Sequence, residues 1–158
     1  MEVTQLHKGD VSQVDGIWCM TLKDDATKKQ RLKNRVSQRI VPIHSAVLKA
    51  GLLEWVTAQP AGQLFPKLKV YGVQKSSGWF AHLLKNLGIK TPSLTQHSMR
   101  HTMTVKLERA RVHYSLMRRL LGHAVGHSVE DRVYLGSLSY SAQELSEALE
   151  SVVFPPIP

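Results

Sequence analysis

The hydrophobic pattern of this 158-residue chain changes its period near residue 44. Before that point, residues 15–22 run from a turn into a short apolar segment with Trp18 and Met20 on one face and Ile17, Cys19 and Thr21 on the other, and residues 39–43 form a second short apolar run. Alternation over a few residues indicates a β-strand, and a proline such as Pro42 ends a strand or lies at a sheet edge. The two segments therefore predict a pair of antiparallel strands joined by a long polar loop over residues 23–38.

After residue 44, apolar residues recur at helical spacing. The spacing, with Gly and Pro as breakers, predicts an irregular link over residues 64–78 and helices over about residues 44–59, 79–87, 95–109 and 113–121. Ser141 and Glu144 have the spacing of a capping box, which predicts the start of a last helix. The expected fold class is α+β: one mostly helical domain over residues 1–158 with a small antiparallel sheet.

Positive charge is concentrated in two parts of the sequence. The chain has 21 Lys and Arg against 12 Asp and Glu, a net charge of +9. One basic group lies between residues 23 and 39, and a second runs from Arg100 to Arg119, whereas residues 133–158 contain neither Lys nor Arg. A local basic surface favours a polyanionic partner such as nucleic acid, and an incidental solvated surface is the alternative.

Composition disfavours several other classes of protein. Apolar stretches are short and interrupted, so no segment is long enough to span a bilayer. The single cysteine, Cys19, has no partner for an internal disulfide, which fits a reducing compartment. The hydrophobic fraction of 42% and the charged fraction of 21% are typical of a globular chain rather than a disordered one.

Four residues in the C-terminal part form the principal candidate site: His97, Arg100, His123 and Tyr134. Residues three apart on a helix share a face, so His97 and Arg100 could bind the same ligand. An arginine can bind two phosphate oxygens at once, and a histidine can donate to a third or move a proton. Each pattern is weak alone, but the order and spacing of all four together indicate one site.

The segment 97–134 resembles the signature of the tyrosine site-specific recombinases, the phage integrase family. That signature is His-x-x-Arg-His-Thr, then Leu-Gly-His, then a nucleophilic tyrosine, and the chain has these parts in the same order at matching intervals. Upstream, the chain resembles the family hairpin Lys…Ser-x-Arg-x-Val-Pro-(Ile/Leu)-His. Lys33 matches its catalytic lysine, with Lys28 and Lys29 as alternatives. The resemblance covers essentially the whole chain and implies the catalytic-domain fold of that family.

The resemblance also implies a role for each of five residues. Tyr134 would attack a DNA phosphate, forming a 3′-phosphotyrosyl bond and releasing a 5′-hydroxyl. Arg100 would stabilise the non-bridging oxygens, with a further hydrogen bond from His123. His97 would accept or donate a proton, and Lys33 would protonate the leaving 5′-oxygen. This chemistry requires no metal or other cofactor.

The family signature has one more arginine, in a helix upstream of the hairpin. Residues 2–6 resemble the end of that stretch, so we expect an N-terminally truncated catalytic domain that lacks this arginine and the family's separate N-terminal DNA-clamping domain. Losing one preorganised donor at a developing oxyanion costs ~2.7–4 kcal/mol. We therefore expect weak DNA binding and poor cleavage.

Two other interpretations stay open on the residues alone. His97 and His101, like His123 and His127, have the spacing of a helical zinc pair, although Ser98 replaces the general-base glutamate of a His-Glu-x-x-His site. The second interpretation is a non-catalytic DNA-binding remnant of an integrase. The resemblance itself implies double-stranded DNA as the partner, a tetramer on DNA in full-length relatives, and a cytoplasmic, nucleoid-associated protein of prokaryotic or phage origin.

Overall fold

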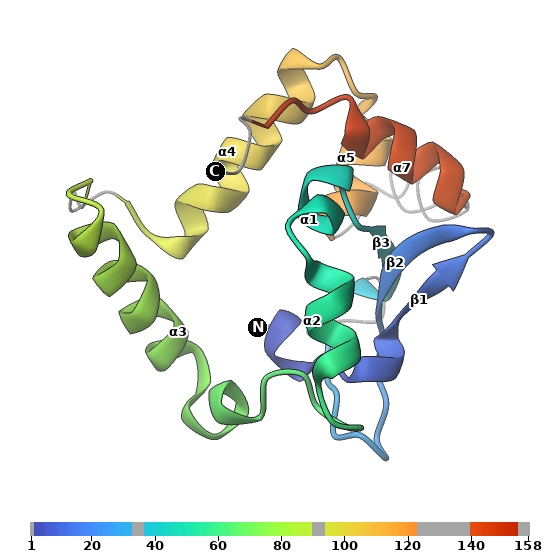
Figure 1. Cartoon of the computed structure of the whole chain (residues 1–158). Helices are drawn as coiled ribbons and strands as arrows, with labels where there is room; N and C mark the ends of the chain where they lie inside the picture. Colours follow the sequence, from blue (N-terminus) through green and yellow to red (C-terminus); the bar gives the residue numbers. More distant parts are fainter. Residues whose placement is uncertain (1, 33–36, 90–93, 123–139, 155–158) are drawn as a thin grey trace, which may run out of the picture.

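The chain folds into helices around a small β-sheet (Figure 1), which confirms the expected α+β class. The computed structural model describes residues 2–32, 37–89, 94–122 and 140–154. In chain order the elements are η1 (Val3–Gln5), η2 (Lys8–Asp10), β1 (Val11–Val14), β2 (Ile17–Leu22), β3 (Arg39–Pro42), α1 (Ser45–Lys49), α2 (Leu52–Ala58), α3 (Pro66–Asn86), α4 (Gln96–Arg109), α5 (Tyr114–Leu121) and α7 (Ala142–Glu150).

The sheet is antiparallel in the order β1-β2-β3, with β3 at one edge. The two predicted strands correspond to β2 and β3, and Pro42 is the last residue of the edge strand, as expected. Strand β1 was not predicted. It pairs with β2 through the two-residue turn Asp15-Gly16, in which both residues have positive φ, 51° and 80°. This is the type I′ geometry that favours Asp-Gly in a hairpin.

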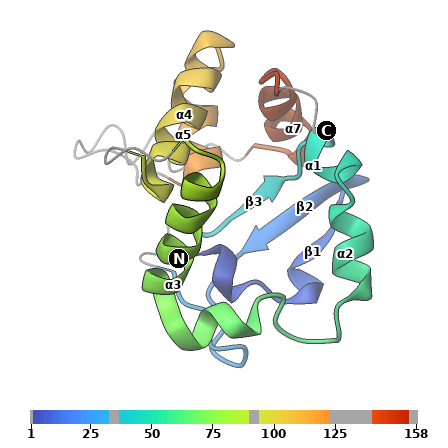
Figure 2. The ribbon, with the colours of Figure 1, turned by 60° about the vertical axis from the view of Figure 1, so that its left-hand side comes forward.

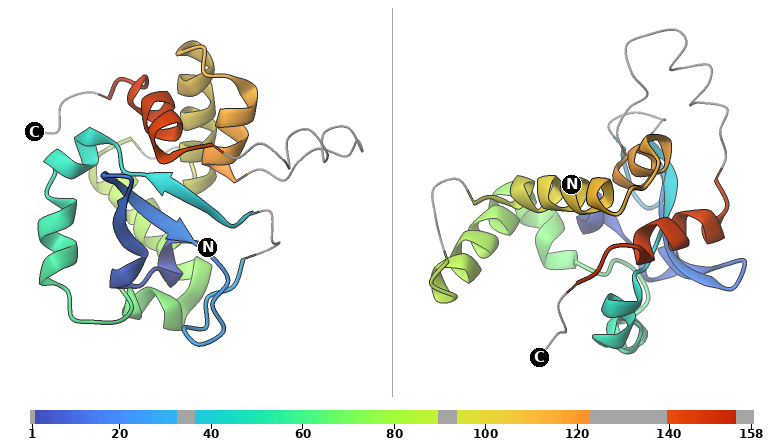
Figure 3. Two further views of the ribbon diagram at one scale, coloured as in Figure 1. Left: turned by 90° about the vertical axis from the view of Figure 1, so that its right-hand side faces the viewer. Right: turned by 90° about the horizontal axis from the view of Figure 1, so that it is seen from above.

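Two hydrophobic clusters form the core. The N-terminal cluster packs strand residues against α2, and its buried members are Leu6, Val11, Leu22, Ile43, Val56 and Leu64. The helical cluster joins α4, α5 and α7, and its buried members are Leu107, Met117, Leu120, Leu145, Ala148, Leu149 and Val152. Because side chains alternate along a strand, Val41 packs with the first cluster and Ile40 with the second. In Figures 2 and 3, α5 and α7 lie along β3, with α1 and α2 on the other side of the sheet.

Two of the predicted elements differ in the structure. The helix predicted over residues 44–59 is divided into α1 and α2 at Gly51, which has a φ of 85° and therefore interrupts the helical conformation. The irregular link predicted over residues 64–78 is wrong. The helix α3 begins at Pro66 and continues without a break to Asn86. A proline in the first turn of a helix lacks only an N–H that would have no intrahelical partner, so Pro66 starts this helix rather than breaking it.

The remaining helices are confirmed. Helices α4 and α5 have nearly the predicted bounds, and Gly122 ends α5 in the left-handed conformation with a φ of 66°. The capping box of α7 is present: the backbone N–H of Glu144 donates to Oγ of Ser141. None of the helices in the described part of the chain has the length and apolar composition that crossing a membrane requires.

Candidate active site

Helix α4 supplies two of the candidate residues, His97 and Arg100. The helix begins where the backbone N–H of Thr95 donates to Oγ of Ser98 at 3.0 Å. In its last turn, Leu107 is fully buried in the helical cluster, which holds α4 against α5 and α7. Both candidates therefore lie in the first two turns of a helix that the core fixes in place.

The Arg100 side chain reaches the C-terminal end of α5. It is half-buried, and Nη1 donates to the carbonyl oxygen of Leu121 at 2.6 Å. The last carbonyls of a helix lack intrahelical partners and have a partial negative charge, so a guanidinium is stabilised there. This contact places Arg100 beside Gly122, the residue before His123 in the sequence.

His97 lies on the exposed surface of α4. Its ring packs edge-on against the ring of His101, with 5.2 Å between the centroids. His123 and His127, the other predicted pair of zinc ligands, lie outside the described residues. Within residues 2–32, 37–89, 94–122 and 140–154, no group of three or more His, Cys, Asp or Glu side chains is placed to bind a metal ion.

Gly122, in the Leu-Gly-His sequence, packs directly against the side chain of Arg39. A Cβ atom added at Gly122 would overlap Cζ of Arg39, lying closer than two nonbonded atoms can approach. Its φ of 66° independently disfavours any residue with a side chain. Glycine is thus required here both by the backbone conformation and by the neighbouring guanidinium.

Arg39 itself is buried, with 6% of its surface exposed. Nη1 and Nη2 donate to the two carboxylate oxygens of Glu2 at 3.0 and 2.8 Å, a bidentate ion pair. Nη1 also donates to the carbonyl of Ser37 at 2.8 Å, and Nε donates to the carbonyl of Leu120 at 3.3 Å. A buried charge needs such partners, because removing one unpaired ion from water costs on the order of several kcal/mol.

Three guanidinium groups gather at this end of α5, those of Arg39, Arg100 and Arg119, and we call them the arginine cluster. Burial and the charge of Arg39 both lower the pKa of Arg119. Burial raises the pKa of Glu2, but the hydrogen bond and charge of Arg39, with the charge of Arg100, outweigh it and hold that pKa below 4.5. Glu2 is therefore ionised at neutral pH, and the cluster creates a positive potential that suits an anionic ligand.

The connection between β2 and β3 is anchored at its base by Asp10. This buried carboxylate accepts hydrogen bonds from the backbone N–H of His7 at 2.8 Å, from Nε2 of Gln30 at 2.6 Å and from Nζ of Lys28 at 3.4 Å. Burial raises the pKa of Asp10, but these three contacts outweigh the effect and leave it below its ordinary value of 3.8. Lys28, an alternative for the hairpin lysine, is thus paired with Asp10.

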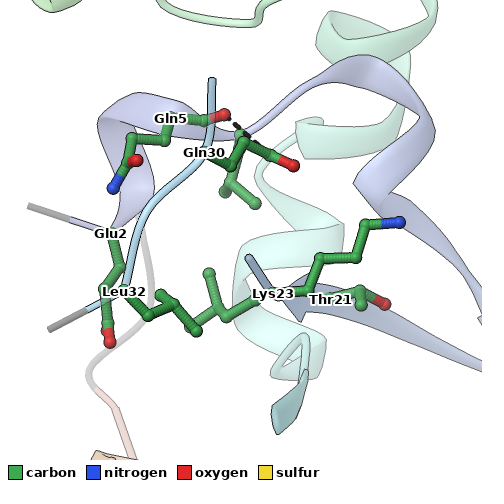
Figure 4. Close-up of a pocket in the computed structure, with 8 residues that line it drawn as sticks. Glu2, Gln5, Thr21, Lys23, Gln30 and Leu32 are labelled. Atoms are coloured by element: carbon green, nitrogen blue, oxygen red, sulfur yellow. Dashed lines mark hydrogen bonds between the residues drawn. The ribbon is translucent and has the colours of Figure 1, made fainter. Parts of the chain in front are cut away.

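A small hollow lies beside this anchor (Figure 4). It is lined by Glu2, Gln5, Leu6, Thr21, Leu22, Lys23, Gln30 and Leu32. Nε2 of Gln30 donates across it to the backbone carbonyl of Gln5 at 2.8 Å. Its volume of about 10 Å³ leaves room for one water molecule at most, so it is a packing defect rather than a substrate site.

The structure brings Arg100 to the end of α5 but leaves part of the predicted site untested. Lys33, His123 and Tyr134 lie outside the described residues. Arg39 belongs to the family hairpin motif and Glu2 to the upstream stretch, but sequence reasoning assigned neither residue a role in the site. The available signal was a charged residue at the start of an otherwise apolar strand, which indicates a buried ion-pair partner.

Comparison with known proteins identifies the family. The model of the phage integrase family matches residues 1–138. No curated protein and no solved structure matches the chain. The family match spans most of the sequence and includes α4, α5 and the arginine cluster. The protein therefore belongs to the phage integrase family, the tyrosine site-specific recombinases that cut and rejoin DNA.

Proposed function

We propose that this protein breaks and rejoins DNA strands through a 3′-phosphotyrosyl intermediate, with Tyr134 as the nucleophile. The observation that supports the proposal most strongly is the arginine cluster at the end of α5. Arg100 is held there by Leu121, one residue from the Gly-His step of the family signature. A preorganised guanidinium at a developing oxyanion is the kind of group that accelerates phosphoryl transfer.

The proposed reaction has two balanced steps. The phenolic oxygen of Tyr134 attacks the scissile phosphate, the Tyr–O–P bond forms, and the bond from phosphorus to the 5′-oxygen breaks. His97 accepts the phenol proton, and Lys33 gives a proton to the departing 5′-oxygen. Arg100 and His123 stabilise the extra negative charge on the non-bridging oxygens. In the second step a 5′-hydroxyl attacks the phosphotyrosine and reverses these transfers.

The proposed partner is double-stranded DNA. The net charge of +9 and its concentration in two segments favour a polyanion. Family resemblance further suggests that four protomers assemble on the DNA site, as in full-length relatives.

The direct test is covalent trapping. A nicked duplex that loses the short fragment bearing the freed 5′-hydroxyl should give a protein–DNA adduct that resists denaturing electrophoresis, and the expected poor cleavage predicts that this adduct forms slowly. Tyr134→Phe should abolish the adduct, because it removes the nucleophile. Arg100→Ala should lower its rate by about 10²–10³, the usual cost of one oxyanion donor. Tyr114→Phe, which alters an exposed tyrosine on α5, is the matched control and should retain wild-type adduct formation.

A non-catalytic DNA-binding protein is the second candidate, and it is favoured by the basic segments, which bind DNA without any chemistry. It predicts no adduct in any variant and an affinity for unrelated duplexes that falls steeply with salt. For a protein that neutralises Z phosphates, log K falls with log salt at a slope of about −0.9Z. An adduct that depends on Tyr134 would exclude this candidate.

A further inference from the structure

We infer that Arg39 is a positioning residue for strand cleavage: it holds the C-terminal end of α5, and through that helix end the guanidinium of Arg100. The inference rests on the proposed function, because it assigns a role in the same reaction. The inference also predicts where the Arg100 guanidinium lies in the protein without DNA, which can be measured without any cleavage.

Arg39 is not placed to bind DNA itself. Four of its N–H groups donate to protein oxygens, of Glu2, Ser37 and Leu120, and a guanidinium has five. Its side chain is 5% exposed, so a phosphate could reach it only if the ion pair with Glu2 opened. Its effect on the reaction must therefore pass through another residue.

The contacts of Arg39 join three segments that are far apart in the sequence. Glu2 lies in the N-terminal turn, Ser37 in the connection before β3, and Leu120 in the last turn of α5. An arginine can do this because its planar fork directs several donors at fixed angles. A lysine at this position would keep the charge but could not make the bidentate pair and the two carbonyl contacts together.

Arg39 and Arg100 bind consecutive carbonyls of the same helix end. Nε of Arg39 donates to Leu120, and Nη1 of Arg100 donates to Leu121. Gly122, the next residue, packs against the Arg39 guanidinium. A shift of Arg39 would therefore move the acceptor on which Arg100 depends.

Glu2 couples the two arginines electrostatically as well. Its carboxylate is paired with Arg39 and also lies within the field of Arg100. If Arg39 no longer held Glu2, the freed carboxylate could pair with Arg100 and draw it away from Leu121. The loss of Arg39 thus both loosens the helix end and creates a competitor for the Arg100 guanidinium.

The test combines Arg39→Lys with Arg100→Lys in a double-mutant cycle on the adduct rate, at a temperature where thermal unfolding shows every variant folded. Arg39→Lys alone should lower the rate by about 10²-fold, the usual cost of misplacing a catalytic group by 1 Å, with the Kd for DNA unchanged. In the Arg100→Lys background the same change should have little further effect, because residues that act through one another are not additive. Equal losses in both backgrounds would show a general structural role and overturn the inference.

A second readout needs no catalysis. In the nitrogen-resolved NMR spectrum of the free protein, the Nη protons of Arg100 should exchange slowly with water because one of them is bonded to Leu121. Arg39→Lys should accelerate that exchange. If the wild-type protein forms no adduct, the proposed function fails, and the NMR measurement still decides whether Arg39 positions Arg100. Unchanged exchange in Arg39→Lys would refute the positioning role.

Discussion

At the scale of single residues, the arrangement at the end of α5 depends on a glycine and an arginine that fit each other. Gly122 leaves the space that the Arg39 guanidinium occupies, and Arg39 binds the carbonyl two residues before it. Leu-Gly-His is thus more than a helix stop followed by a histidine. Its glycine permits a buried charge to lie against the backbone.

Gly122→Ala should destabilise the protein more than Gly88→Ala. Both glycines end helices at nearly the same φ, 66° and 69°, so each substitution incurs left-handed strain of ~1–2 kcal/mol. Only at Gly122 would the new Cβ also collide with Arg39, whereas nothing lies within 4 Å of one at Gly88. Urea unfolding at pH 7 measures both losses, and equal losses would contradict the packing described here.

The sequence could predict some of this site but not all of it. His97 and Arg100 were placed on one helix because their spacing is local and α4 has a clear start. The pairing of Glu2 with Arg39 joins residues 37 positions apart and depends on how the N-terminal turn packs against β3. No local pattern encodes that contact, and Lys33, His123 and Tyr134 remain predictions.

At the scale of elements, the helices were predictable where their ends had strong local signals. Gly88 and Gly122 end α3 and α5, and the capping box begins α7, because these residues satisfy or release backbone groups by themselves. The link predicted over residues 64–78 is wrong because Pro66 occupies the first turn of α3, where a proline starts a helix instead of breaking it.

Helix α7 gives a prediction at this scale. Leu145 is fully buried on the face that packs into the helical cluster. Leu145→Ala should therefore lower the free energy of unfolding by about 2–5 kcal/mol, as for other buried leucines. Gln143→Ala on the exposed face of the same helix should change stability by less than about 0.5 kcal/mol. Urea unfolding measures both. Similar losses for the two variants would mean that α7 is not docked as described.

At the scale of the whole molecule, the buried carboxylate of Asp10 and the half-buried carboxylate of Glu2 connect the N-terminal turns to the sheet and to the strand connection. Asp10 anchors the connection after β2, and Glu2 pairs with the first residue of β3. Both have a folded-state pKa below the ordinary value. A carboxylate of this kind adds stability above its unfolded pKa, and that stability is lost as the pH falls through the lower, folded pKa.

The protein should therefore lose stability below about pH 4, near the ordinary pKa of these side chains. Asp10→Asn should be less stable at pH 7 and should show a shallower decline in acid, because one linked group has been removed. Asp15→Asn, at the exposed hairpin turn, should follow the wild-type pH profile. The measurement is the urea midpoint between pH 3 and 7. A wild-type midpoint that does not fall in acid would contradict the ion pairs.

The contacts of Arg39 also have a consequence in time. They join the N-terminal turn, the strand connection and α5. Glu2 lies 37 positions from Arg39 in the chain, and Leu120 lies 81 positions from it. Contacts that close such long loops form after local structure, so we expect them to be largely absent from the folding transition state. Weakening them should then raise the unfolding rate and leave the folding rate nearly unchanged. Arg39 would determine how long the assembled site persists rather than how quickly it forms.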